Sequence, residues 1–278
     1  YVDGRYTFQA NTQINAKEIQ AKHLNNFWTD LEKILLEEEY KIALDPTLHS
    51  IIEIEKVLKM LENSTSQLQL IDKNFVDLIW ENQPKTQYTD IFDHPRSFSG
   101  QGRSEKLDIL KKFLDQNEID HYFVSGLDNI AWLLNLRADD IKYTPLLYSY
   151  LLISKNNKHS LYIKESSMPE ILKKEIQTLI NINNIENVRS IFNNINSSES
   201  IGLDFNSTTF YFLDLLRKQK INTKNLSNPC ILLKAVKNET ELDGAKKAHI
   251  RDGVSISKYI YWLKTVSYTH LRAHETTC

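Results

Sequence analysis

The sequence predicts an α/β fold made of two tandem modules, followed by the start of a third domain. Segments with strand periodicity alternate with segments of helical periodicity along most of the chain. A loop rich in Ser, Gly and Pro at 90–102 interrupts this alternation, which then begins again. A helix with a strong start signal follows Asn238.

The first module is expected to span residues 1–95. Residues 40–44 and 67–71 alternate between apolar and polar side chains and are predicted strands. Apolar residues recur at helical spacing in 51–61, which predicts a helix between the two strands. Asn26 is expected to cap another helix that begins at the next residue.

The second module is expected to span residues 96–228. Its predicted strands are 119–125, 146–154, 159–163 and 201–204. Its predicted helices carry their apolar positions within 107–114, 127–136, 168–179 and 210–216. The repeated order of elements indicates a structural duplication, although no residue-level repeat accompanies it.

Residues 229–265 are expected to open a third domain. Cys230–Lys234 is a short predicted strand. Asn238 and Glu241 have the spacing of an N-terminal capping box, and apolar residues continue from there to Trp262. A long helix with nothing after it to pack on indicates that the remainder of this domain is absent.

The tail, residues 266–278, is expected to be sequencing-adapter read-through rather than protein. Val266–Thr276 matches the translation of a library adapter, so the segment is not expected to form part of the fold. His270 and His274 stand four residues apart, a spacing that can share zinc on a helix. The zincin motif needs Glu directly after the first His, and that position is Leu271.

Composition excludes several classes of protein. The 278 residues contain 34 Lys and Arg against 36 Asp and Glu, a net charge of −2, which argues against a nucleic-acid partner. No apolar run approaches the roughly 20 residues of a membrane helix, so no membrane association is expected. Two cysteines cannot form a disulfide scaffold, which favours a reducing compartment.

The sequence assigns no catalytic, cofactor-binding or metal-binding residue. Ser99–Gly102 precedes a helix and could cradle phosphate, but it lacks the further glycines and the Lys-Ser/Thr pair of such motifs and is interpreted as an inter-domain loop. The carboxylates near strand and helix ends are interpreted as turn or cap residues: Asp128, Asp139 and Asp140. The isolated histidines are interpreted as packing residues: His121 in a strand and His249 in a helix.

Four blocks of the sequence resemble one known family. They are residues 2–10 (VDGRYTFQA), 74–84 (NFVDLIWENQP), 127–153 (beginning LDNIAWLLNLRADDI) and 235–263 (beginning AVKNETELDGAKKAHIRDG). In order and spacing they are similar to the cytosolic-type Xaa-Pro aminopeptidases of the creatinase/prolidase pita-bread superfamily. The resemblance extends over nearly all of residues 1–265.

The resemblance implies a fold and a reaction. The fold is two creatinase-N-type α/β domains, each a mixed sheet with flanking helices, ahead of a pita-bread catalytic domain. The reaction removes an N-terminal residue that precedes proline, at a dinuclear metal centre that usually holds manganese. Peptides with proline at the second position are the implied partners, and the implied parent enzyme is a cytoplasmic homodimer.

The same resemblance implies that this fragment is inactive. The family's metal ligands and proton-handling histidines follow the position of Leu263, and its substrate-contacting arginine precedes Tyr1. Arg5 belongs to a different part of the pattern and is not given that role. Ala138 stands where relatives often have Gly, which suggests a slightly altered turn. We therefore expect the fragment to bind no manganese.

Two alternatives stay open at this point. Some proteins of this fold have lost the metal ligands and bind peptides or histones without catalysis, and the ligand positions of the full sequence would decide between the two. Relatives that cleave creatine or dipeptides usually have one N-terminal domain, which fits the two predicted modules less well.

Overall fold

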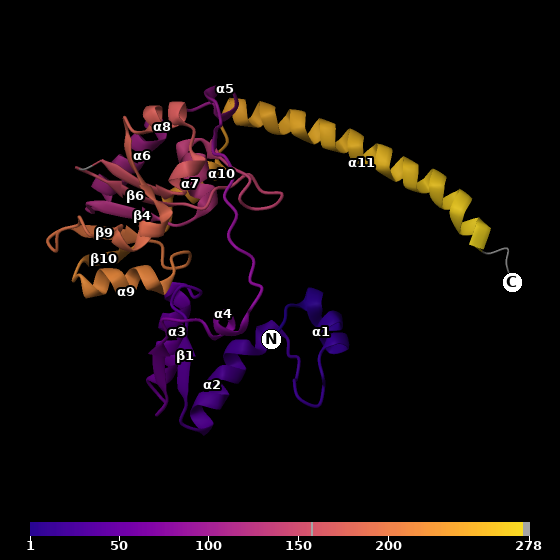
Figure 1. Cartoon of the computed structure of the whole chain (residues 1–278), viewed down its shortest axis with the longest axis horizontal. Coiled ribbons are helices and arrows are strands. Elements are labelled where there is room, and N and C mark those ends of the chain that lie inside the picture. The colour runs from indigo at the N-terminus through magenta and orange to yellow at the C-terminus, as the bar shows by residue number, and fades with distance from the viewer. Residues whose placement is uncertain (157, 275–278) are drawn as a thin grey trace. The chain divides into compact units, whose positions relative to one another are not determined.

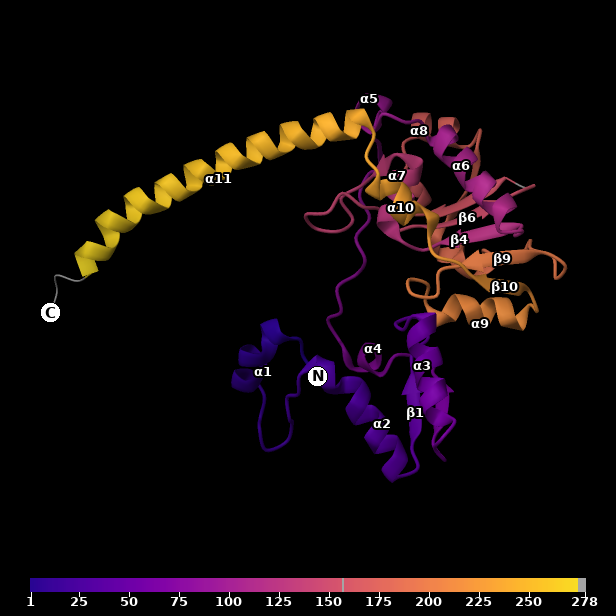
Figure 2. The same cartoon turned by 180° about the vertical axis from the view of Figure 1, so that it is seen from behind.

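The computed structural model describes residues 1–156 and 158–274, with side-chain environments up to residue 266 apart from residue 157. The chain divides into two compact units, which are described separately below and can be traced from both sides in Figures 1 and 2. The first unit contains 1–86, 195–198 and 203–226, and the second contains 87–194, 199–202 and 227–278.

A short parallel pair of strands forms the sheet of the first unit. Strands β1 (Lys41–Leu44) and β2 (Gln67–Leu70) pair in parallel, and helix α3 (Ile51–Leu61) connects them. The helix begins at a reciprocal capping box: Glu53 N–H donates to Ser50 Oγ at 3.4 Å, and Ser50 N–H donates to the Glu53 carboxylate at 2.9 Å. The predicted strand–helix–strand order of this unit is confirmed.

The other elements of the first unit are α1 (Thr7–Gln13), α2 (Phe27–Glu37), α4 (Phe75–Ile79), α9 (Phe210–Lys218) and β10 (Asn222–Asn225), with 3₁₀ turns at Gly4–Tyr6 and Leu24–Asn26. The prediction that Asn26 caps α2 is wrong. Asn26 already has helical backbone angles and its side chain makes no cap hydrogen bond. Instead, His23 Nδ1 accepts from Asn25 N–H at 3.2 Å and begins the preceding 3₁₀ turn.

A mixed sheet of six strands runs in the order β10-β9-β4-β6-β7-β8. Pairs β4–β6 and β6–β7 are antiparallel, whereas β4–β9 and β7–β8 are parallel. Besides β10, the strands of this sheet are β4 (His121–Val124), β6 (Tyr150–Ser154), β7 (His159–Ile163), β8 (Ile180–Asn184) and β9 (Ser200–Leu203). The boundary between the compact units falls within β9.

Both faces of the central strand β4 are covered inside the second unit. Successive strand residues point to opposite faces of a sheet. The Tyr122 ring meets Phe113 of helix α6 (Arg103–Gln116) at 5.5 Å between centroids, and the Phe123 ring meets Phe192 at 5.3 Å. Every residue of β4 is buried, as expected for a strand enclosed on both sides. The predicted α/β class, with a mixed sheet and flanking helices, is confirmed.

The further elements of the second unit are α5 (Arg96–Ser99), α7 (Leu127–Leu134), α8 (Glu170–Ile176), α10 (Pro229–Ala235), α11 (Glu239–His274), the strand pair β3 (Phe92–Asp93) and β5 (Leu136–Arg137), and 3₁₀ turns at Glu165–Ser167 and Ile185–Ser190. The strand predicted at Cys230–Lys234 is wrong, because this segment lies in α10. Asn228 accepts from the Cys230 N–H at 3.0 Å and Pro229 occupies the first helical turn, two signals that start a helix.

Helix α11 extends away from the rest of its unit (Figures 1 and 2). Its predicted capping box is confirmed, and residues 249–265 are all exposed. Exposed apolar and aromatic side chains in this stretch are Ile250, Val254, Ile256, Tyr259, Ile260, Tyr261, Trp262 and Leu263. None of the helices in the described part of the chain combines the length and apolarity that a membrane span requires.

Candidate functional site

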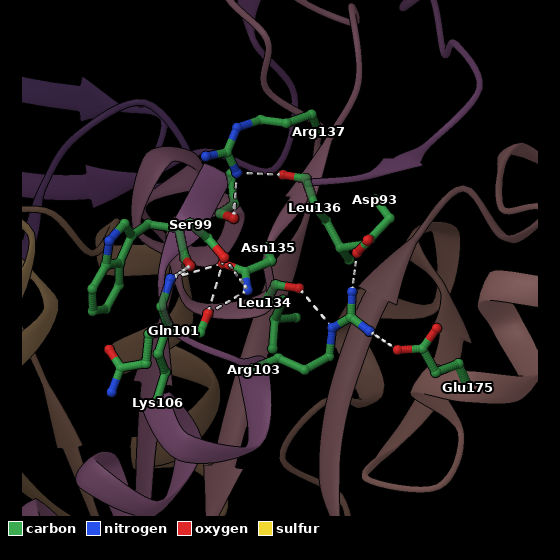
Figure 3. A network of polar contacts seen from close by, with 12 residues as sticks. Asp93, Ser99, Gln101, Arg103, Lys106, Leu134, Asn135, Leu136, Arg137 and Glu175 are labelled. Carbon is green, nitrogen blue, oxygen red and sulfur yellow. Dashed lines mark hydrogen bonds and ion pairs between the residues drawn. The ribbon is translucent and has the colours of Figure 1, made fainter. Parts of the chain in front are cut away.

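A polar network at the end of α7 is centred on Asn135 (Figure 3). Asn135 follows α7 in the left-handed conformation, with φ 51° and ψ 42°, which Asn tolerates better than most residues. Its Oδ1 accepts a 2.7 Å hydrogen bond from Lys106 Nζ. Its Nδ2 donates to the Gln101 main-chain oxygen at 2.9 Å and to Ser99 Oγ at 3.3 Å. One buried side chain thereby links α5, α6 and α7.

Lys106 is the second member of this network and is only 1% exposed. Besides its bond to Asn135, its Nζ donates to the Trp132 main-chain oxygen at 2.7 Å and lies 4.1 Å from the centroid of the Trp132 ring. Burial lowers the pKa of the Lys106 amine to about 8, and the positive charge of Arg137 adds to this effect while Glu241 opposes it. The amine is therefore a buried cation at neutral pH.

Three cationic side chains bind main-chain oxygens at the C-terminal end of α7. Lys106 binds Trp132, Arg103 Nε donates to the Leu134 oxygen at 3.0 Å, and Arg137 donates to the Ala131 oxygen at 2.6 Å. The last carbonyls of a helix lack partners within the helix and carry partial negative charge. The cations satisfy those carbonyls, which stabilises the left-handed turn that Asn135 makes.

The Arg103 guanidinium also pairs with Asp93 and Glu175, so that it joins α6 to β3 and α8 (Figure 3). It lines a surface pocket of about 310 Å³, whose other lining residues include His94 and Arg96. Burial lowers the pKa of His94, with further contributions from Arg137 and Lys106. The arginines and carboxylates that line the pocket are thus already paired within the protein.

The described residues contain no group of three or more His, Cys, Asp and Glu side chains able to hold a metal ion. They therefore do not fit a dinuclear metal centre. Cys230 is buried and burial raises the pKa of its thiol to about 12, which keeps the thiol protonated and unreactive. The network has the chemistry of a structural junction.

The Ser99–Gly102 loop connects α5 to α6 inside the second unit. The Gly102 N–H donates to the Glu105 carboxylate at 2.9 Å, so an internal anion occupies the start of α6. Gly100 has φ +69° and lies so close to Asn238 that a Cβ on Gly100 would stand 2.4 Å from Asn238 Oδ1. The loop contacts protein groups where a phosphate would have to bind.

Two of the acidic residues considered from the sequence, Asp128 and Asp140, have structural partners. Asp128 pairs with Lys234 of α10. Asp140 Oδ1 accepts from Thr89 N–H at 2.7 Å, and Oδ2 accepts from Tyr148 N–H at 2.9 Å. The contacts of Asp140 with two main-chain N–H groups agree with the interpretation of these carboxylates as turn or cap residues. The neighbouring Asp139 is exposed.

His121 forms part of a buried Ser–His–acid series. Its Nδ1 lies 3.0 Å from Ser154 Oγ, and its Nε2 lies 3.5 Å from a carboxylate oxygen of Glu199. Ser154 and His121 are each 3% exposed, so a substrate cannot reach the hydroxyl. The interpretation of His121 as a packing residue of a strand agrees with this burial.

His249 lies exposed on α11, where its Nδ1 contacts the Ala245 oxygen of the same helix at 2.8 Å. The expected helix-packing role is therefore wrong for the described part of the chain. The side chains of His270 and His274 lie outside the described residues, as do those of the whole tail 267–278. Arg5 pairs with Asp3 beside the first 3₁₀ turn, at 2.7 Å.

Sequence reasoning missed the network around Lys106 and Asn135. One signal was available: Lys106 stands four residues before Leu110 and eight before Leu114, on the apolar stripe of α6. A lysine on the buried stripe of an amphipathic helix needs internal partners. The partners themselves come from a segment almost thirty positions later, which no local pattern identifies.

Comparisons with known proteins agree on one family. Residues 82–241 match the Creatinase/Prolidase N-terminal domain. A probable Xaa-Pro aminopeptidase P of Leptosphaeria maculans is 30% identical over 276 residues, which cover 94% of this chain and 45% of that protein. A protein of the same name from Sordaria macrospora is 31% identical over 284 residues, with the same coverage.

The fold has a counterpart among solved structures. The X-prolyl aminopeptidase of Caenorhabditis elegans, a cytosolic enzyme with a di-nuclear active site, matches with a TM-score of 0.83 and 24% identity, over 97% of this chain and 45% of that one. The chain thus spans about half the length of the curated relatives it matches. The resemblance seen in the sequence is confirmed: the chain belongs to the creatinase/prolidase N-terminal domain family, and its relatives include Xaa-Pro aminopeptidases.

Proposed function

We propose that this chain is the N-terminal part of a metallo-aminopeptidase that hydrolyses the bond between an N-terminal residue and a following proline. The observation that carries the proposal is the match of 94% of the chain to relatives named Xaa-Pro aminopeptidase P, with only 45% of their length covered. A dedicated enzyme suits this substrate, because proline has no amide N–H and a fixed φ. Peptides with proline at the second position are the proposed substrates.

We propose the following domain organisation. Residues 1–95 and 96–228 form two creatinase-N-type domains, residues 229–265 begin a catalytic domain, and residues 266–278 are adapter read-through. The exposed face of α11 supports the third element, since its apolar side chains lack cover among the described residues. The division of the described chain after residue 86 supports a boundary in the region before 96.

The metal centre is proposed to lie in the part of the parent protein that this chain does not contain. The described residues do not supply a dinuclear ligand set, so no step of the reaction is assigned to them. The relative from Caenorhabditis elegans has a di-nuclear active site, and we propose two manganese ions for the parent enzyme here. Cytoplasmic location and homodimer formation are part of the same proposal.

The test uses the full-length parent and the present chain side by side. With manganese and an Xaa-Pro-Xaa peptide, the parent is expected to release the N-terminal residue, and an Xaa-Ala-Xaa peptide serves as the control substrate. Residues 1–278 alone are expected to show no turnover above the blank. Robust cleavage by residues 1–278 would contradict the proposed place of the metal centre. A parent that binds the peptide without cleaving it would instead favour a non-catalytic peptide-binding relative.

The tail proposal has its own test. Deletion of residues 266–278 is expected to leave the melting temperature unchanged, because the preceding residues 249–265 of α11 are exposed. A large drop in melting temperature after the deletion would show that the tail belongs to the folded protein.

A further inference from the structure

The first turn of α11 is tied to the rest of the second unit by the same two residues that cap it. Within the cap, Glu241 N–H donates to Asn238 Oδ1 at 2.9 Å, and Asn238 N–H donates to Glu241 Oε2 at 3.0 Å. Each side chain has one further polar atom. Asn238 Nδ2 donates to the Ser99 main-chain oxygen at 2.9 Å, and Glu241 Oε1 accepts from Trp132 Nε1 at 3.2 Å.

The position of the Trp132 indole is fixed by Lys106. Lys106 places its cation 4.1 Å from the ring centroid and donates to the Trp132 main-chain oxygen at 2.7 Å. A cation over an indole face is favourable, and more so when it is removed from water. The ring is therefore fixed with its N–H directed at Glu241, and the buried Lys106 and the helix cap bind the same side chain.

The hydrogen bond from Asn238 to Ser99 and the one from Trp132 to Glu241 lead to the same group of residues. The Ser99 residue whose carbonyl binds Asn238 also accepts from Asn135 Nδ2 through its hydroxyl, and Asn135 Oδ1 binds Lys106. Gly100 approaches Asn238 so closely that no Cβ would fit between them. Both hydrogen bonds thus connect the first turn of α11 to one group of residues at the C-terminal end of α7, which includes the buried Lys106 and Asn135.

Beyond its first turns, the described part of α11 has few packing contacts that could fix the direction of the helix axis. Residues 249–265 are exposed along the described part of the helix. The helix from Glu241 to Leu263 spans about 33 Å at the α-helical rise. A tilt of about 10° at the first turn would move the far end by about 6 Å. A small change in the geometry of these two hydrogen bonds therefore produces a large displacement at the far end of the helix.

We propose that Trp132 and Glu241 are positioning residues that fix the direction in which α11 leaves the second unit, with Lys106 holding the indole in place. The consequence for catalysis rests on the proposed function: the part of the enzyme that follows α11 takes its position relative to the second unit from this contact.

The direct test measures distances in the chain itself. Spin labels at Lys112→Cys on α6 and Lys258→Cys on α11 are introduced in a Cys278→Ser background, and both lysines replaced are exposed. Buried Cys230 is expected to stay unlabelled. Double electron–electron resonance is expected to give one narrow distance distribution for the parent chain. Trp132→Phe keeps a ring over Lys106 but removes the N–H donor. Because a small tilt at the start of α11 displaces the distant label, this variant is expected to broaden the distance distribution about twofold.

A matched control and a second variant complete the test. Glu239→Gln removes an acid from the same helical turn, where the described contacts include no hydrogen bond or ion pair of its side chain, and is expected to leave the distribution unchanged. Glu241→Gln removes the charge and keeps a cap-forming side chain, and is expected to broaden the distribution as Trp132→Phe does. An unchanged distribution in both Trp132→Phe and Glu241→Gln, with helix content preserved by circular dichroism, overturns the proposal.

Activity is a separate readout in the full-length enzyme. Trp132→Phe is expected to lower kcat/KM for an Xaa-Pro-Xaa peptide about tenfold with metal content unchanged, as follows when reacting groups are misplaced. Glu239→Gln is expected to retain the parent kcat/KM. If the full-length parent cleaves no such peptide, the proposed function fails while the distance result still decides the positioning role. If Trp132→Phe broadens the distances but leaves kcat/KM unchanged, the catalytic consequence is overturned.

Discussion

The Nζ atom of Lys106 lies 4.1 Å from the centroid of the Trp132 ring and donates a 2.7 Å hydrogen bond to the main-chain oxygen of the same residue. The contact combines a cation–π interaction with the capping of a helix carbonyl, and it takes place out of water. Desolvation is the cost of this arrangement, and it appears in the pKa of the amine, which falls from 10.5 to about 8. The stability of the chain should therefore respond to alkaline pH.

We expect the free energy of unfolding to rise between pH 8 and 10.5 through Lys106. In this window the folded chain has released the proton while the unfolded chain still holds it, so increasing pH favours the folded state. The contribution is at most about 3 kcal/mol. Lys106→Met should lack this rise, as measured by guanidinium unfolding at several pH values. Lys112→Met, on the exposed side of α6, should keep it; an equal rise in both variants would refute the assignment.

His159 should produce a pH dependence of the same sign at acid pH. Burial lowers the pKa of its imidazole from 6.5 to about 4, and its Nδ1 accepts from Ser154 N–H at 3.1 Å. As pH falls through this window only the unfolded chain gains a proton, so the free energy of unfolding falls by about 3 kcal/mol. His159→Gln keeps an acceptor and should flatten this slope in urea unfolding curves. The exposed His249→Gln variant is the control and should retain the slope.

Substitutions at Asn135 should separate backbone strain from side-chain bonding. Asn135→Ala loses the hydrogen bonds to Lys106, Ser99 and Gln101 and keeps a Cβ at φ 51° without the polar side chain that makes Asn tolerant of this conformation, so we expect a loss of about 3 kcal/mol. Asn135→Gly loses the same bonds without the steric cost of a left-handed Cβ, and should be about 1 kcal/mol more stable than Asn135→Ala. Chemical denaturation measures both. Equal losses would mean that the backbone conformation carries no strain for Ala.

Two glycines provide a matched pair around α11. Gly100→Ala combines φ +69° with a Cβ 2.4 Å from Asn238 Oδ1, so it should lower stability by about 2 kcal/mol or more and disturb the start of α11. Gly244 lies on α11 with nothing within 4 Å of an added Cβ. Gly244→Ala should raise helix content and add up to about 1 kcal/mol. Thermal melts followed by circular dichroism test both; a harmless Gly100→Ala would show that Asn238 can move aside.

The sequence predicted the elements that carry their own local signal. The strand at 159–163 and the helix over α9 follow from periodicity, and the start of α11 follows from Asn238 and Glu241, whose capping box is local in sequence. Strand β8 was not predicted, although Ile180 and Ile182 alternate with asparagines, because asparagine favours turns over strands. The short apolar run at Cys230–Lys234 fits either a strand or a helix, and Asn228 with Pro229 decides for the helix.

The contacts of the candidate site could not be predicted from the sequence, because they join residues that are far apart along the chain. The contact between Lys106 and Asn135 joins residues 29 positions apart, and that between Trp132 and Glu241 joins residues 109 apart. Such pairs depend on how α6, α7 and α11 are brought together, which periodicity does not specify. The family resemblance rests on blocks that include 127–153 and 235–263, yet it identifies no contact between residues of these two blocks.

The mixed order of the main sheet also imposes an order on its assembly. Strands β6 and β7 follow one another directly along the chain and can pair as soon as both have been synthesised. Strand β4 must wait for β9, since Tyr122 pairs with Gly202, 80 residues later. Closing so long a loop costs more chain entropy than closing a hairpin. On the ribosome, β4 therefore emerges with one edge that stays unpaired until residue 202 has been made, and during this time the edge is open to wrong pairing.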